Sequence, residues 1–158
     1  MQHKYIAILT AALISLTGCA SLPSDAPSYS SAPIAPDGYA TVYIYRVGAK
    51  PNQRKPSVLI GSQKVFEPPE LAYTWVYARA VEQPFRIEWA WDTGWPPLAF
   101  TMALTTGQSY YLKISGSFEN KGTVWRLGSN ARWVPRGEAE RELTECCKFV
   151  RAEFPRVQ

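Results

Sequence analysis

The chain has 158 residues, of which 13% are aromatic, and its formal net charge is +4 at pH 7. The positive charges are scattered, without a block of five or more, which argues against nucleic acid as a partner because nucleic-acid-binding proteins gather basic residues into a patch. The one histidine, His3, lies near the N-terminus, so the later sequence excludes Ser-His-Asp and Cys-His catalysis and histidine-ligated metal sites. We expect a protein that is not an enzyme and that uses no cofactor or metal.

The first 18 residues have the layout of a secretory signal peptide. Lys4 supplies a positive charge, and residues 6–16 are almost entirely apolar. This stretch is shorter than the ~20 residues that cross a bilayer. The ending Leu16–Cys19 (Leu-Thr-Gly-Cys) resembles the lipobox of bacterial lipoproteins. The resemblance implies cleavage of the leader and lipidation of Cys19 with acyl chains such as palmitate; a plain signal peptide with a chance cysteine is the alternative.

The residues after Cys19 indicate where the protein is sorted and how far its domain can stand from the membrane. Ala20 follows Cys19, and in enterobacterial lipoproteins the absence of Asp there implies sorting to the outer membrane, provided that the host is Gram-negative. Residues 19–38 are rich in Pro, Ser and Ala and nearly uncharged, which predicts an extended tether with a coil-like span of about 25 Å. We expect a domain that is lipid-anchored at the periplasmic face of the cell outer membrane and held clear of the headgroups.

Residues 39–158 are long enough for one domain with its own core. Residues 39–47 combine aromatic and β-branched side chains on both faces, which predicts a central strand. Residues 57–60 and 63–66 flank Gly61-Ser62, a sequence typical of a hairpin with a type II′ turn.

Later segments continue the strand signal. Five further strands are expected, over residues 71–80, 85–91, 98–104, 109–114 and 123–127. The first three alternate in side-chain type with period two, which favours sheets with one buried face, and residues 115–122 are expected to form a loop. The spacing predicts a mostly β fold, an antiparallel β-sandwich of about seven or eight strands.

The C-terminal part has helical periodicity. Apolar residues recur at helical spacing, at Ala139, Leu143, Cys146 or Cys147, Val150 and Phe154. The pattern predicts one amphipathic helix over residues 136–153, docked by Leu143 and Val150 and stopped by Pro155.

Cys146 and Cys147 are the only thiols left after lipidation of Cys19. Export makes oxidation favourable, but helix geometry disfavours a disulfide between adjacent residues. We expect one of the two to point into the core as a small apolar residue, and the other to be a free thiol or to join two chains.

Four pieces in order carry a family resemblance: residues 40–46, the hairpin 58–65, residues 107–114 and the acidic C-terminal helix. Together they resemble the bacterial lipoproteins of domain of unknown function 2846, over about residues 38–150. The family shows a Pro-Gly-x-His step before the next strand, where this chain has Glu82–Phe85. The resemblance implies a β-sandwich envelope lipoprotein and supplies no activity or functional residues.

The tryptophans offer the one candidate contact surface. Trp75, Tyr77, Trp89 and Trp91 are expected in the sheet core, whereas Trp95 lies in the turn Asp92–Pro97 and is expected to be exposed. We expect this loop to bind a partner through Trp95, with Trp91 and Asp92 beside it. We expect a non-catalytic binding or assembly accessory, with an envelope protein as partner; the alternative is a carbohydrate- or peptidoglycan-binding module that uses this aromatic loop.

Overall fold

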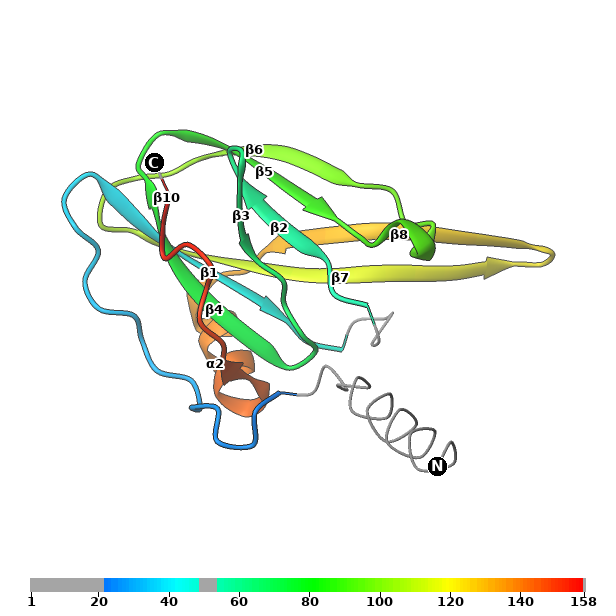
Figure 1. The fold of residues 1–158 in the computed structure, drawn as a ribbon, viewed down its shortest axis with the longest axis horizontal. Coiled ribbons are helices and arrows are strands. Elements are labelled where there is room, and N and C mark those ends of the chain that lie inside the picture. Colours follow the sequence, from blue (N-terminus) through cyan, green and yellow to red (C-terminus); the bar gives the residue numbers. More distant parts are fainter. Residues whose placement is uncertain (1–21, 49–53, 158) are drawn as a thin grey trace, which may run out of the picture.

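The computed structural model describes residues 22–48 and 54–157, and Cys19 and the leader lie outside the described residues. The described chain forms two β-sheets that face each other and an α-helix near the C-terminus (Figure 1). The expected mostly β, sandwich-like fold class is confirmed. Ten strands are present in the described part, more than the seven or eight expected.

The larger sheet has the order β10-β4-β1-β7-β8, with β9 also beside β4. Its strands are β1 (Tyr39–Arg46), β4 (Ala72–Arg79), β7 (Ser109–Lys121), β8 (Val124–Trp133), β9 (Lys148–Phe149) and β10 (Arg156–Val157). β1 is antiparallel to β4 but parallel to β7, and β9 and β10 are parallel to β4. The sheet is therefore mixed rather than purely antiparallel.

The smaller sheet has the order β3-β2-β5-β6, and all its pairs are antiparallel. Its strands are β2 (Ser57–Ile60), β3 (Gln63–Phe66), β5 (Glu82–Glu88) and β6 (Leu98–Ala103). The expected hairpin is β2–β3, and Gly61 in its turn has a φ of 61°, in the left-handed region that glycine adopts without steric cost. This part of the sequence-based prediction is confirmed.

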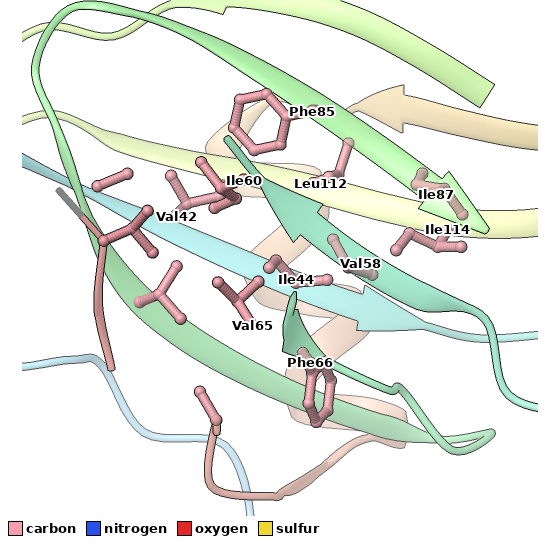
Figure 2. Packing of buried hydrophobic residues seen from close by; sticks show 14 of the residues in the cluster. Val42, Ile44, Val58, Ile60, Val65, Phe66, Phe85, Ile87, Leu112 and Ile114 are labelled. Carbon is pink, nitrogen blue, oxygen red and sulfur yellow. The ribbon is translucent and has the colours of Figure 1, made fainter. Parts of the chain in front are cut away.

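The main core fills the space between the two sheets (Figure 2). β1 contributes Val42 and Ile44, and β5 contributes Phe85 and Ile87 from the opposite sheet. Because successive strand residues point to opposite faces, Tyr43 and Tyr45 of β1 lie on the other face of the larger sheet, where a second apolar cluster forms. Both faces of β1 are buried, as expected for a central strand.

β4 shows which face of an alternating strand is turned to the core. Its small residues Ala72, Val76 and Ala78 are fully buried in the inter-sheet core. Its large residues Trp75 and Tyr77 are half-buried on the opposite face, so the expectation that they lie in the core of the sheet is wrong. The bulky aromatic residues instead form the outer face.

The β7–β8 hairpin is longer than expected. Residues 115–122 are not a loop, because the strand register continues from Leu112–Trp133 to the pair Lys121–Val124. Pairing of β7 with β1 ends at Ile114, and the rest of the hairpin extends beyond the sandwich as an arm (Figure 1). Cross-strand backbone hydrogen bonds maintain these strands despite their Ser, Gly and Asn residues, which favour turns.

The outer face of the larger sheet is covered by α2 (Arg136–Cys146). Ala139 and Leu143 of the helix are fully buried in the cluster that includes Tyr45 and Tyr111, so docking through Leu143 is confirmed. The helix ends at Cys146 rather than at residue 153, and the chain continues as β9.

Part of residues 22–38, including Tyr29 and Ala32, also lies on this outer face. The segment is extended, as expected, but it is bound to the sheet: Ala32 donates its backbone N–H to Tyr43 Oη at 2.8 Å, and Ser30 donates to Tyr73 Oη at 3.0 Å. Tyr77 Oη donates to the carbonyl of Pro33 at 3.1 Å. This part of the chain therefore packs on the domain instead of spanning free space as a tether.

Candidate functional site

The loop after β5 buries Trp89, as expected, but it places Trp91 and Trp95 differently from the expectation. Trp95 is only 9% exposed and its ring centroid lies 4.8 Å from that of Trp89, so the prediction of an exposed Trp95 is wrong. Trp91 is 94% exposed, so its expected place in the core is also wrong. In this loop Trp91 is exposed to solvent, whereas Trp89 and Trp95 are buried and packed on each other.

Local geometry explains this exchange of roles. Residues Trp91–Thr93 form a single turn of 3-10 helix, η2, which ends at Gly94 with a φ of 66°. Thr93 Oγ1 donates to the carbonyl of Ala90 at 2.6 Å and accepts the backbone N–H of Trp95 at 3.3 Å. The turn reverses the chain, and Trp95 is brought back onto Trp89 while Trp91 projects away.

The buried side chain of Arg46 contacts the tryptophan loop and the segments next to it. Its side chain is fully buried, forms an ion pair with Glu70 at 3.2 Å, and its guanidinium carbon lies 5.1 Å from the ring centroid of Trp89. It also donates to the carbonyl of Arg54 at 2.8 Å. Burial lowers the pKa of Arg46, and the Glu70 carboxylate opposes that shift; arginine remains charged in proteins.

Arg46 therefore joins β1, the segments before β2 and β4, and the tryptophan loop. Arg46 was not among the functional residues expected from the sequence. The available signal was a charged residue within an otherwise apolar strand, since buried charges are kept only when they are paired and hydrogen-bonded.

A surface cleft of about 420 Å³ lies beside the loop. It is lined by Arg54, Lys55, Ser57, Glu67, Glu88, Trp89 and Ala90. Trp91 and Asp92 do not line the cleft: they follow Ala90, which does, and Asp92 forms an ion pair with the lining residue Arg54. Two of the sequence-predicted residues, Trp91 and Asp92, are therefore next to the cleft, while Trp95 is packed on the lining residue Trp89.

Glu67 is the acidic group of the cleft with a shifted pKa. The ammonium of Lys64 donates to its carboxylate at 3.0 Å, and Ser57 Oγ donates at 3.1 Å. These hydrogen bonds, the one from Lys64 above all, lower the pKa of Glu67 although burial acts to raise it. Glu67 is therefore a carboxylate at neutral pH, able to accept hydrogen bonds but not to donate a proton.

The chemistry of this surface is that of a polar binding site with one aromatic face. A guanidinium, an ammonium and two carboxylates offer directed hydrogen bonds, and the exposed indole of Trp91 offers an apolar surface for stacking. In residues 22–48 and 54–157, no His, Cys, Asp and Glu side chains gather in a group that could hold a metal ion. The same residues include no helix long and apolar enough to cross a membrane.

Comparisons of the chain with protein-family models, with curated proteins and with solved structures found no match.

Proposed function

We propose that the protein is a lipid-anchored, non-catalytic binding protein of the bacterial envelope. In this proposal Cys19 is the acylated N-terminus, and the domain faces the periplasm from the outer membrane. The proposal rests on the charged and apolar leader, on its Leu-Thr-Gly-Cys ending, and on the ordered pieces that resemble the domain of unknown function 2846 lipoproteins.

The binding surface in this proposal is the cleft lined by Arg54, Glu67 and Glu88 together with the neighbouring Trp91, which we call the Trp91 cleft. The observation that carries it is the 94% exposure of Trp91, which directly follows the cleft residue Ala90. The other two tryptophans of the loop are packed together and fix its backbone, so binding has to order only the side chain of Trp91. A tryptophan buried at an interface can contribute about 2 kcal/mol or more to binding.

The ligand that fits this surface best is a glycan, such as a peptidoglycan strand. A sugar ring has an apolar face that stacks on an indole, and hydroxyl edges that hydrogen bond to charged planar groups such as those of Arg54 and Glu88. Binding without hydrolysis is favoured because both carboxylates of the cleft are paired with cations, Glu67 with Lys64 and Glu88 with Arg86, whereas a glycosidase needs one carboxyl group as proton donor.

The test compares Trp91→Ala with Phe154→Ala, which also truncates an exposed aromatic residue. Both variants are measured for co-sedimentation with purified peptidoglycan and for affinity to soluble glycan fragments. We expect Trp91→Ala to weaken binding about 30-fold, equivalent to ~2 kcal/mol, with an unchanged melting temperature, and Phe154→Ala to bind as wild type.

Equal binding by Trp91→Ala and wild type would refute the Trp91 cleft as the glycan site. If wild type binds no glycan and Trp91→Ala loses an envelope protein partner, the cleft is a protein-binding surface and the assembly-accessory function replaces the glycan-binding one.

A further inference from the structure

The junction between α2 and β9 holds a disulfide between two adjacent residues, Cys146 and Cys147. Neither the expected free thiol nor the expected link between chains is present; the two cysteines are bonded to each other. Cys147 is buried and extended, with φ −113° and ψ 142°, while Cys146 is half-buried at the end of the helix. Cys147 donates its backbone N–H to the carbonyl of Leu143 at 3.0 Å.

This bond accounts for the early end of the helix. The apolar spacing from Ala139 to Phe154 is helical, and residues 147–153 include neither Gly nor Pro. At 3.6 residues per turn, adjacent side chains project about 100° apart around a helix. A disulfide between neighbours is incompatible with that geometry, so Cys147 leaves the helical conformation and α2 stops.

The backbone N–H groups of residues 148–150 donate hydrogen bonds to segments outside α2. Lys148 donates its N–H to the carbonyl of Leu71 at 3.0 Å, and Val150 donates to that of Tyr73 at 2.9 Å. On the other side, the N–H of Phe149 donates to the carbonyl of Pro27 at 2.7 Å. Residues 148–150 therefore lie between β4 and the N-terminal segment and bind both.

A side-chain contact adds to this link. Lys148 Nζ donates to Ser28 Oγ at 2.8 Å, and the two residues also form an isolated β-bridge. If residues 147–153 became helical, these backbone groups would turn to intrahelical partners, and the N-terminal segment would lose this attachment.

We propose that the Cys146–Cys147 disulfide is a redox-sensitive latch that selects between these two arrangements. When it is closed, α2 ends at Cys146 and residues 22–38 are held on the domain. When a dithiol reductant opens it, α2 extends toward Glu153 and the N-terminal segment loses its attachment at Pro27 and Ser28. The segment keeps its hydrogen bonds to Tyr43, Tyr73 and Tyr77, and it detaches more readily.

The redox step is ordinary thiol–disulfide exchange. A thiolate of the reductant attacks Cys146 Sγ, the more accessible sulfur, the Cys146–Cys147 bond breaks, and Cys147 leaves as a thiolate that takes up a proton. The second thiol of the reductant then attacks the mixed disulfide. Cys146 is released and protonated, and the reductant ends as its own disulfide.

The latch has a consequence that rests on the proposed lipid anchor. Residues 22–38, when released, would behave as a coil with a span of about 22 Å. Reduction would thus let the domain move away from the membrane, and oxidation would hold it close.

The test uses the full chain, oxidised or treated with a dithiol such as dithiothreitol, and the double variant Cys146→Ser, Cys147→Ser, which cannot form the bond. We expect the reduced protein and the double variant to gain helical circular dichroism. We expect the amides of Ser30 and Ala32 to exchange hydrogen at least about tenfold faster, while that of Val42 on β1 stays protected. Dithiothreitol should leave the double variant unchanged.

Adding Arg151→Pro to the double variant shows whether residues 147–153 become helical or only lose their contacts with β4 and the N-terminal segment. Proline disfavours helix at its own position and at the residue before it, so the gain in helical signal should disappear. The latch is refuted if reduction leaves the exchange of Ser30 and Ala32 and the helical signal unchanged, or if core amides lose protection together with them. Because the reduction test needs no anchor or ligand, it is independent of the proposed function.

Discussion

At the residue scale, single polar groups tie the helix to the larger sheet. Glu142 of α2 accepts hydrogen bonds from Tyr45 Oη at 2.7 Å and from Lys113 Nζ at 2.6 Å. Burial acts to raise the pKa of Glu142, but the hydrogen bonds from Lys113 and Tyr45 outweigh it and leave that pKa below its ordinary value. One carboxylate thus connects three elements, α2, β1 and β7.

The lowered pKa of Glu142 makes its contribution to stability depend on pH. A carboxyl group whose pKa is depressed in the folded state stabilises the fold fully above its unfolded pKa of about 4.5, and loses this effect as the pH falls through the folded pKa. We expect Glu142→Gln to lower the free energy of unfolding by about 1 kcal/mol at pH 7, and the difference to shrink below pH ~4.5. Urea denaturation at pH 7 and pH 3 measures this, with the exposed Glu145→Gln as control. The same deficit at both pH values would contradict the assignment.

At the scale of elements, α2 is held by its apolar side chains. Leu143 is fully buried among the tyrosines of the outer face. Leu143→Ala should lower the free energy of unfolding by about 2–4 kcal/mol, because the truncation leaves a cavity. Chemical denaturation measures the change, with the exposed Arg141→Ala as control. A loss below about 0.5 kcal/mol would mean that the helix is a loose appendage.

The tryptophan loop allows a paired test of its two exchanged positions. Trp95 is packed on Trp89, whereas Trp91 is in solvent. Trp95→Ala should cost about 3 kcal/mol of stability, and Trp91→Ala should change it by less than about 0.5 kcal/mol. Thermal or urea unfolding of the two variants decides this, and similar costs for both would contradict the described arrangement of the loop.

At the scale of the whole molecule, the distance between anchor and domain is shorter than a free tether would give. Leu22 packs against the inter-sheet core. It lies only three residues after Cys19. A fully extended chain spans about 3.5 Å per residue, which limits this distance to about 10 Å. In the proposed lipid-anchored state, the domain therefore lies close to the bilayer surface.

The anchor itself is tested by Cys19→Ser. We expect this variant to leave the outer-membrane fraction, as uncleaved or soluble protein, because two or three acyl chains at about 0.8 kcal/mol per buried CH₂ are needed for stable attachment. Fractionation and immunoblotting measure it. The double variant Cys146→Ser, Cys147→Ser should still be found with the membrane. A Cys19→Ser protein that fractionates like wild type would refute lipidation at this residue.

Local patterns were sufficient to predict most strands. β1, the β2–β3 hairpin and the alternation of β4, β5 and β6 follow from side-chain period and turn chemistry, which depend only on neighbouring residues. Leu143 was also predicted correctly, because helical spacing identifies the buried stripe wherever the helix docks.

The tertiary structure decided which of several compatible arrangements each pattern adopts. Alternation in β4 shows two faces but not which one meets the second sheet, and here the small residues do. In the loop, the alternating pattern that ends at Trp91 and the Gly- and Pro-containing turn around Trp95 favoured the opposite assignment, and the 3-10 turn after Trp89 decides which ring is buried.

The end of α2 shows the limit most clearly. The sequence by itself determined that residues 136–154 have helical periodicity, since that property is local. The Cys146–Cys147 disulfide joins neighbouring residues, but the hydrogen bonds of residues 148–150 to β4, to the Leu71 carbonyl before it and to Pro27 depend on segments distant in sequence. These non-local partners offset the local preference for helix, which is why the strand β9 could be known only from the folded chain.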